Sequence, residues 1–375
     1  MLNCNDLSAG ALLTIDLGAV CDNWRTLRSH LKGAACGAVV KADAYGLGAL
    51  KVAPALYRAG CRHFFVAHLT EGMALRAVLA ADAMIYVLHG AHPGAERELV
   101  AHQLTPVLNS VAQLSAWREM ARDLNQALPG VLQVDTGMAR LGLSSEDFYR
   151  VTTDPVALQG IELKFVMSHL VSAEEPDNAI NTAQRALFES ALRCLPGVKA
   201  SLANSSGIFL GGDYHFDLVR PGAALYGVAP VPGQANPLRQ VVRLQGKVIQ
   251  TRRVAAGTGV GYSHTWTASR PSRVATVAVG YADGYLRSLS NRGELFFEGL
   301  RLPLVGNVSM DTITVDVTEV PPSQLQDGAL IDLMDPLNGV DAVAARAHTI
   351  GYEILTSLGH RYARSYTEAA VSQPA

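Results

Sequence analysis

The stretch GAVVKADAYGLG, residues 37–48, decides the fold, because a buried strand in it ends on a lysine. Its apolar run from Ala38 to Val40 is typical of a strand that is covered on both faces. Lys41 ends that run, Tyr45 follows four residues later, and a Gly-Leu-Gly turn closes the segment. Lysine is rarely buried, so a lysine at the end of a core strand is a candidate functional residue. The residues that end the other apolar runs are therefore candidates too.

Eight such apolar runs alternate with longer amphipathic stretches. They are residues 37–40, 63–67, 84–89, 105–108, 130–135, 161–169, 199–204 and 215–219. Helix-like pieces such as residues 69–82 and 109–127 lie between them, with apolar residues three and four apart. Eight strands with intervening helices predict a (β/α)8 barrel, although periodicity alone leaves a doubly wound sheet open.

The composition changes at APVPGQANP, residues 229–237, which indicates a domain boundary. Short β-rich runs follow and predict a mostly antiparallel β domain; they are residues 240–254, 273–281, 293–299, 312–318 and 329–335. A helix-like piece, residues 342–359, comes near the end. We therefore expect a barrel over residues 1–235 and a β-rich domain over 236–375, with the first 20 or so residues a candidate to pair with the second domain.

The overall composition narrows the classes of function. A net charge of −2 gives no footprint for nucleic acid or an anionic membrane, and no apolar run has the length of a membrane span. The N-terminus has no basic residue before Arg25 and carries Asp6, unlike a secretory signal. Five scattered cysteines without a CxxC pair predict buried or half-buried thiols rather than disulfides or a metal site. We expect a cytoplasmic protein.

Lys41 is the first candidate for chemistry. In a barrel it would lie at the carboxyl end of the first strand, on the rim where active sites are built. Burial there lowers the pKa of a lysine, and the neutral amine can then attack a carbonyl group. Its position alone leaves a solvated, purely structural lysine equally open.

Other polar and small residues follow strands that end on the same rim. They are Arg140 in VDTGMARLG, His169 in VMSHL, Asn204, Ser205 and Ser206 in LANSSG, and Arg220 and Gly222 in LVRPGAALYG. Two arginines in one mouth indicate an anionic ligand. Small residues with backbone N–H groups near a helix start can form a phosphate cradle.

Eight motifs, in order from residue 39 to residue 359, resemble the alanine racemase family. They are VVKADAYGLG, VDTGMARLG, SLANSSG, RPGAALYG, GVGYSHTW, VAVGYADGY, LVGNVSMD and GYEILTSLG. The resemblance implies a barrel plus a C-terminal β domain, pyridoxal 5'-phosphate as cofactor, and interconversion of L- and D-alanine. In that role the product would supply cell-wall precursors, or the enzyme would serve D-alanine catabolism.

The same resemblance implies roles for particular residues. Lys41 would hold the cofactor covalently, Arg220 would face its pyridine nitrogen, and His169 would orient Arg220. Arg140 would approach the ring hydroxyl and the substrate carboxylate. The remaining cofactor-binding residues would lie around the phosphate; they are Tyr45, Asn204, Ser205, Gly222, Ala223 and Tyr352.

Racemisation needs a proton removed from one face of Cα and another supplied to the opposite face. The family implies two bases, here Lys41 and Tyr262. It also implies that Tyr262, Tyr281, Met310 and Asp311 come from the second subunit of a homodimer, the last three as substrate-binding residues. No metal is expected, and we assign His63, His68 and His89 to structure.

The chain departs from the family pattern in three places. Gln133 stands where many members carry a carbamylated lysine, so we predict no carbamate near Arg140; a modified lysine found there by intact mass would contradict this. Ser309 stands where cysteine is frequent, and Leu47 where histidine is frequent.

Three other functions compete with alanine racemisation. A racemase of another small amino acid, serine above all, would be distinguished by the width of the pocket near Tyr352 and Met310, which sequence alone does not decide. A decarboxylase of the same architecture would use a cysteine–aspartate pair in the second domain, so Ser309 with Tyr262 favours a racemase. A cofactor carrier built on one barrel would not need the second domain and its tyrosines.

Overall fold

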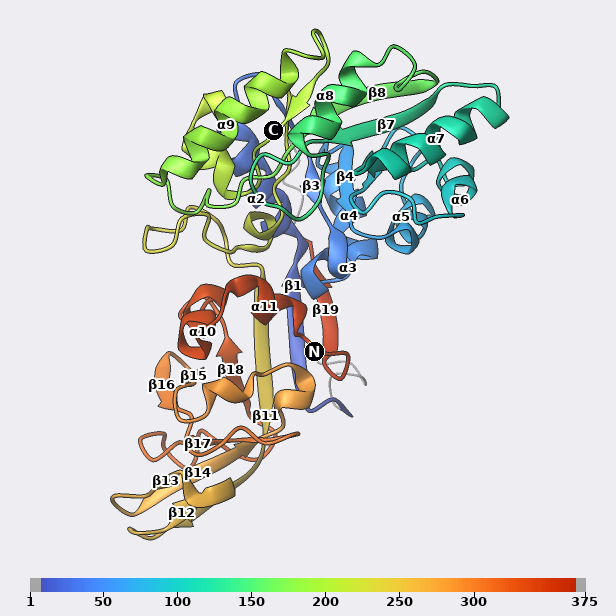
Figure 1. The fold of residues 1–375 in the computed structure, drawn as a ribbon. Helices are drawn as coiled ribbons and strands as arrows, with labels where there is room; N and C mark the ends of the chain where they lie inside the picture. The colour runs from blue at the N-terminus through green and yellow to red at the C-terminus, as the bar shows by residue number, and fades with distance from the viewer. Residues whose placement is uncertain (1–7, 369–375) are drawn as a thin grey trace, which may run out of the picture. The chain divides into compact units, whose positions relative to one another are not determined.

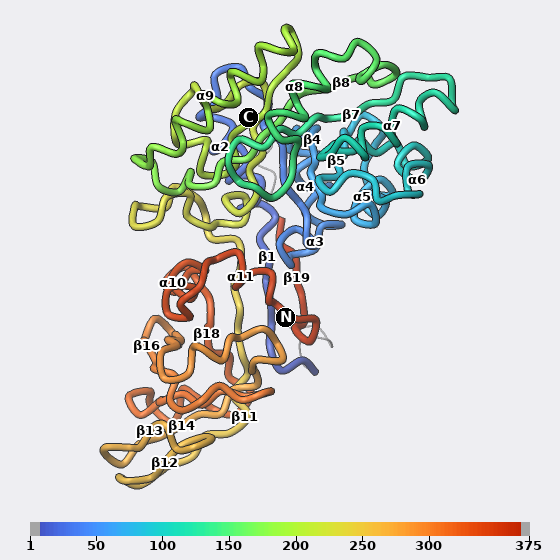
Figure 2. Tube along the Cα trace, viewed as in Figure 1, coloured from blue at the N-terminus to red at the C-terminus, as the bar shows by residue number. Residues whose placement is uncertain are grey.

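The computed structural model describes residues 8–368, which form two compact units. The barrel unit comprises Val20–Leu225 and Ala229–Leu238. Among the described residues, the C-terminal unit combines residues 8–19 with Tyr226–Val228 and residues 239–368. Figures 1 and 2 trace both units along the chain.

The barrel unit is built on short parallel strands. Seven of them form one sheet in chain order: β3 (Ala38–Val39), β4 (His63–Val66), β5 (Met84–Val87), β6 (Thr105–Leu108), β7 (Leu128–Gln133), β8 (Ile161–Met167) and β9 (Ala200–Ser201). An eighth, β10 (Leu218–Val219), pairs in parallel with β2 (Ala35–Cys36), which directly precedes β3.

Hydrogen bonds on both sides of β10 complete the ring. Arg220 N donates to Ala203 O beyond β9, and Val39 N donates to Pro221 O. The parallel sheet therefore closes into the predicted barrel, and the doubly wound alternative is wrong.

Helices form the outer layer of this unit (Figure 1). They are α2 (Leu17–Ser29), α4 (Ala49–Arg58), α5 (Leu69–Arg76), α6 (Glu96–Ala101), α7 (Val111–Asp123), α8 (Ser145–Thr153) and α9 (Ala179–Leu192). The side chains of Ser110, Ser144 and Asn178 cap α7, α8 and α9 by accepting from backbone N–H groups of the first turn. The helix predicted over 69–82 ends earlier, at Arg76.

Aromatic side chains fill the barrel. Phe65 of β4 packs on Tyr86 of β5, with ring centroids 4.7 Å apart, and both rings contact Phe165 of β8. Because β4 and β8 are not neighbours in the sheet, these contacts cross the barrel interior. The interior is therefore a packed core, and a ligand must bind at the rim.

The C-terminal unit is a mostly antiparallel sheet, as predicted. Its strands are β1 (Ala11–Asp16), β11 (Val242–Val254), β14 (Ser272–Val277), β15 (Glu294–Phe297), β16 (Leu300–Pro303), β17 (Ile313–Asp316), β18 (Leu330–Met334) and β19 (Ala363–Thr367). β1 lies between β11, which is antiparallel to it, and β19, which is parallel. A small hairpin joins β12 (Gly259–Val260) to β13 (Trp266–Thr267).

The single helix predicted over residues 342–359 is two helices, α10 (Val340–Ala347) and α11 (Gly351–Thr356). His348 between them has a left-handed backbone, with φ of 57°. Thr349 N then donates to Ala344 O, which closes α10 as a left-handed C-cap and turns the chain before α11.

The cysteine prediction holds in part. Cys21, Cys36 and Cys61 are buried, but Cys194 is exposed because it lies in the surface turn after α9. Cys4 lies outside the described residues. Within residues 8–368, no helix combines the length and the apolar composition that crossing a membrane requires.

Candidate functional site

Lys41 opens an unusual turn at the end of β3. The four residues that follow it, from Ala42 to Tyr45, all have left-handed backbone conformations, with φ between 52° and 56°. Such a conformation costs about 1–2 kcal/mol per residue for an L-amino acid. Gly48 N donates to Asp43 O and Ala49 N to the Asp43 carboxylate, both within 2.8 Å, and these bonds help to hold the turn.

The electrostatics of the rim favour a neutral amine on Lys41. Burial lowers its pKa, the charge of Arg140 lowers it further, and Glu71 acts in the opposite direction. Lys41 therefore gives up its proton at a lower pH than a surface lysine does, as a nucleophile or a general base requires.

Arg220, directly after β10, is a buried cation with only 4% of its surface exposed. Its guanidinium donates to Ser201 Oγ and to Ser168 O, both at 2.6 Å. Burial lowers its pKa to about 9, which leaves it charged at neutral pH. Ser201 in turn donates to Leu218 O, so the guanidinium is fixed by two neighbouring strands.

His169 lies beside this guanidinium, with Nδ1 in a long contact of 3.5 Å from Arg220 Nη2. Arginine can only donate, so Nδ1 is the acceptor. Burial, followed by the charge of Arg220, lowers the pKa of His169 to about 3. The imidazole is therefore neutral at physiological pH.

Ser205 and Tyr45 both pack against the backbone around Gly222. Ser205 Oγ accepts from Gly222 N at 2.9 Å and from Ala224 N at 3.2 Å, and these are the residues on either side of Ala223. A Cβ added to Gly222 would lie 2.4 Å from Tyr45 Oη, so only glycine leaves room beside that hydroxyl. Asn204 accepts from Gly207 N and fixes the start of the same loop.

Arg140 lies in a loop that the Asp135 carboxylate organises. That carboxylate accepts from the backbone N–H groups of Gly137, Met138 and Ala139, each at 2.9 Å. Gln133 is buried, and its Nε2 donates to Leu141 O, next to Arg140.

The remaining predicted residues belong to the C-terminal unit. Tyr262 is 72% exposed, and Tyr281 and Met310 are also exposed. One loop orders their backbones: Asn307 Nδ2 donates to Tyr262 O, and Tyr281 N donates to Ser309 O. We call this set, Tyr262, Tyr281, Met310 and Asp311, the loop face.

Arg361 joins Asp311 of the loop face to the short turn Tyr281–Asp283. Its Nε donates to the buried Asp283 at 2.6 Å and its Nη1 to Asp311 at 2.7 Å. Asp283 also accepts from Gly280 N, directly before Tyr281. Tyr352, the predicted phosphate ligand, lies on α11 and is also exposed.

Sequence reasoning missed Glu71, Ser201 and Arg361. Each contacts a predicted site residue or its neighbour from another part of the chain. A signal existed only for Glu71, which stands four residues after the end of the apolar run 63–67, near the start of the next helix-like piece, where a glutamate commonly caps a helix.

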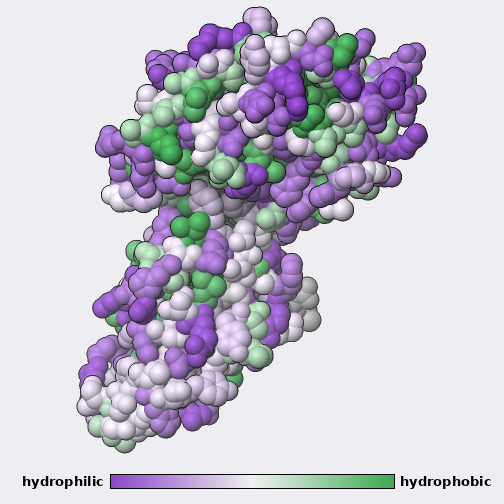
Figure 3. Space-filling view, in the orientation of Figure 1, coloured by the Kyte–Doolittle hydropathy of each residue, from purple (hydrophilic) through white to green (hydrophobic). Residues whose placement is uncertain are grey.

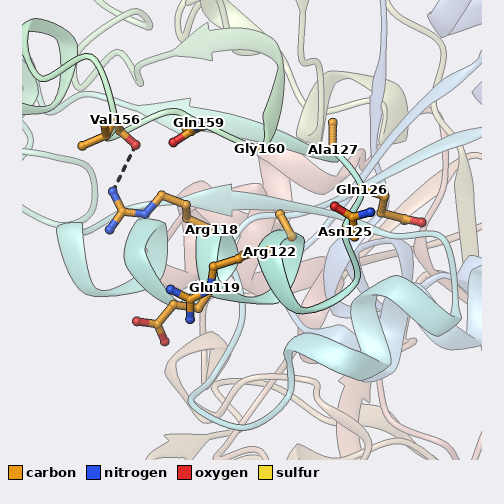
Figure 4. A pocket seen from close by; sticks show the side chains of 10 residues that line it. Arg118, Glu119, Arg122, Asn125, Gln126, Ala127, Val156, Gln159 and Gly160 are labelled. Atoms are coloured by element: carbon orange, nitrogen blue, oxygen red, sulfur yellow. Dashed lines mark hydrogen bonds between the residues drawn. The ribbon is translucent and has the colours of Figure 1, made fainter.

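A groove of about 640 Å³ lies elsewhere on the barrel unit, between α7 and the chain before β7 and β8. Figure 4 shows Arg118 and Arg122 along it, with Arg118 donating to Val156 O. Ala127 and Gly160 in its wall precede the amino ends of their strands, whereas Lys41 follows the carboxyl end of β3. The groove is therefore not part of the Lys41 site, and the surface near α7 is largely hydrophilic (Figure 3).

Comparisons with known proteins agree with this geometry. Residues 15–230 match the family model of the alanine racemase N-terminal domain, and residues 241–366 match that of the C-terminal domain. A catabolic alanine racemase of Mesorhizobium japonicum is 52% identical over 96% of this chain and 94% of its own length. An alanine racemase of Rhodospirillum rubrum is also 52% identical, over 96% of both chains.

A solved structure is similarly close. The alanine racemase of Bartonella henselae, described with covalently bound pyridoxal phosphate, is 44% identical and superposes with a TM-score of 0.92. The match covers 96% of this chain and all of that one.

Proposed function

The chain belongs to the alanine racemase family, and we propose that it interconverts L- and D-alanine with pyridoxal 5'-phosphate bound at the rim of its barrel unit. The observation that carries the proposal is that a half-buried lysine of lowered pKa and the buried cation Arg220 lie on that rim, where the charges of both act on His169.

The residues on the rim fit this cofactor. Gly222 has no Cβ and so allows Tyr45 Oη to approach its backbone closely, and Ser205 Oγ lies against the same backbone. Both hydroxyl groups can donate to a phosphate. We assign the phosphate to Tyr45, Asn204, Ser205, Gly222 and Ala223, and by the family resemblance to Tyr352. The bound cofactor would supply the electron-withdrawing group that acidifies the Cα–H bond of an amino acid.

Two arginines would contact the cofactor ring and the amino acid: Arg220 the ring nitrogen, and Arg140 the carboxylate. Arg220 presents only donors and stays charged at neutral pH, so it has no proton to give readily to a ring nitrogen beside it. Arg140, in the loop that Asp135 orders, would bind the carboxylate of the amino acid through its planar guanidinium.

The proton transfers would belong to Lys41 and Tyr262. The Nζ of Lys41 takes or returns a proton on one face of Cα, because burial and Arg140 favour its neutral form. Tyr262 Oη would serve the opposite face from a second copy of the chain, together with Tyr281, Met310 and Asp311. The exposure of Tyr262 on an ordered backbone supports this assignment.

The primary test is turnover of L-alanine in heavy water, with optical rotation and deuterium at Cα followed together. We expect loss of rotation with deuterium incorporation, and neither with Lys41→Ala. Deuteration without loss of rotation would contradict a two-base racemase, and turnover of L-serine alone would replace alanine as substrate.

The shared site has its own test. We expect Lys41→Ala and Tyr262→Phe chains each to retain little activity, but a hybrid dimer would rebuild one intact site from its two unmutated residues. Random reassociation of equal amounts should therefore restore about a quarter of wild-type activity, because half of the dimers are hybrids and each has one good site. No recovery, with hybrid dimers verified by mass, would contradict sites shared between subunits.

A further inference from the structure

The carboxylate of Glu71, in the first turn of α5, accepts hydrogen bonds from three backbone N–H groups. Oε1 accepts from Ala42 at 2.6 Å, and Oε2 accepts from Ala67 at 2.8 Å and from His68 at 2.9 Å. Bonds to an ionised carboxylate are stronger than those between neutral groups. Glu71 thus joins the chain after β3 to the chain after β4.

The hydrogen bonds of Glu71 lie just beyond the point where the pairing of β3 with β4 ends. Val40 N donates to Phe65 O at 2.8 Å, and β4 continues toward β5 through His89 N and Ala67 O. The N–H groups of Ala42 and Ala67 meet at one carboxylate instead of at a backbone carbonyl. The side chain therefore extends the connection between the strands beyond the end of the ladder.

Helix capping explains only half of this arrangement. A glutamate at the third helical position commonly reaches back to the N–H groups before its helix, and Oε2 does this at Ala67 and His68. Oε1 bonds outside the helix, to the first residue of the left-handed turn. That turn has a backbone cost that external bonds must offset.

We propose that Glu71 is a positioning residue for Lys41: it clamps the left-handed turn to the end of β4 and so fixes the direction in which the Lys41 amine leaves the rim. The inference rests on the proposed role of Lys41 in racemisation. Glu71 itself touches neither substrate nor cofactor in this scheme. It acts through the backbone of Ala42, one residue after the lysine.

The variant that tests this is Glu71→Gln, which keeps the size of the side chain. Its amide group can accept on one side only, and on the other side its NH₂ would face an N–H group, so one side of the bridge is lost. Glu146→Gln is the matched control, because Glu146 is also in the first turn of a helix, α8, and is exposed.

The first readout needs neither cofactor nor turnover. The cofactor-free protein is acylated briefly at a series of pH values, and mass spectrometry gives the rate at Lys41, with the exposed Lys51 as internal reference. Loss of the Glu71 charge alone should shift the Lys41 profile to lower pH, so the test is the plateau at high pH, where the amine is neutral in both proteins. We expect Glu71→Gln to change the plateau rate of Lys41 at least twofold while that of Lys51 is unchanged. An unchanged plateau rate of Lys41 would overturn the inference, even if the thermal midpoint falls.

The second readout is turnover. We expect Glu71→Gln to lower kcat at least tenfold with KM for alanine changed less than threefold, and Glu146→Gln to leave both unchanged. A kcat within twofold of wild type would overturn the inference. If the wild-type chain fails to racemise alanine, the proposed function falls, yet the acylation profile still tests whether Glu71 positions Lys41.

Discussion

The two proposed bases lie in contrasting surroundings, Lys41 on the barrel rim and Tyr262 on the loop face. Lys41 follows a core strand, and the turn after it is strained and held by two carboxylates, that of Glu71 from α5 and that of Asp43 in the turn itself. Tyr262 follows a small hairpin strand and is exposed, although Asn307 fixes its backbone carbonyl. The rim is stabilised by contacts within its own unit, whereas the side chains of the loop face make few of them.

The difference shows how each region meets its chemical task. A lysine needs burial to lower its pKa, so its surroundings must be dense and complete before any ligand arrives. An exposed tyrosine needs only an ordered backbone if a second molecule supplies the rest of its environment. The contrast predicts that changes on the loop face affect activity alone, and that changes at the rim also affect binding and stability.

Among the substitutions that test this contrast, Tyr262→Phe should change activity most. Removing one hydroxyl should lower racemisation by about 10²- to 10⁴-fold, the usual contribution of a general acid or base. Because the side chain is 72% exposed, the urea midpoint of unfolding should stay at its wild-type value. A variant with wild-type rates in both directions would remove Tyr262 from the mechanism.

A smaller effect is expected from Gly222→Ala. The new Cβ would lie 2.4 Å from Tyr45 Oη and would displace that hydroxyl. Pyridoxal phosphate should then bind about 10- to 100-fold more weakly, as overpacking of 1–3 kcal/mol implies. Cofactor titration by absorbance measures this. Gly212→Ala is the control, because a Cβ there meets nothing within 4 Å, and equal losses in both variants would contradict the contact.

Acid should destabilise the rim through His169. Its pKa of about 3 in the folded protein lies below the ordinary 6.5, so the unfolded chain binds a proton that the folded chain excludes. The free energy of unfolding should therefore fall as the pH drops from about 6.5 toward about 3, by at most about 1.4 kcal/mol per pH unit for this proton.

His169→Asn tests this link between burial and pH. Urea midpoints at pH 7, 6, 5 and 4 should fall less steeply in this variant than in wild type. His92→Asn, at an exposed histidine, should keep the wild-type slope. Parallel slopes in His169→Asn and wild type would show that the proton is bound elsewhere.

The smallest effect is expected from Ala42→Gly. Glycine removes the Cβ penalty of the left-handed turn but adds entropy to the unfolded chain, so the free energy of unfolding should change by less than about 1 kcal/mol. Ala74→Gly, in the right-handed α5, should instead destabilise by about 1 kcal/mol. Equal losses at the two positions, by chemical denaturation, would contradict the strain assigned to the turn.

The strands of the barrel could be predicted because each is a short apolar run that ends in a polar residue. Lys41, Arg140, His169 and Arg220 follow such runs, so their common rim followed from the barrel itself. The left-handed turn could not be predicted, since Ala-Asp-Ala-Tyr contains no glycine and locally favours a right-handed helix.

Contacts between residues that are far apart in the sequence could not be predicted either. Ser201 meets Arg220 only because β9 and β10 lie side by side at the closing seam of the barrel, and Arg361 meets Asp283 across 78 residues of sequence. Local patterns carry no record of such pairs. Glu71 belongs to the same group, since Ala42 is 29 residues away from it.

The position of β1 sets an order of events during synthesis. Leu12 pairs with Ala363, near the other end of the described chain, and with Gln245. The barrel can close once β10, which ends at Val219, has left the ribosome. β1 can pair only after β11, and then β19, have been synthesised. Translation at about 5–20 residues per second separates the end of β10 from the end of β11 by about 2–7 s, and from the end of β19 by about 7–30 s. During that interval the edge of β1 is open, and a chaperone or another nascent chain can reach it.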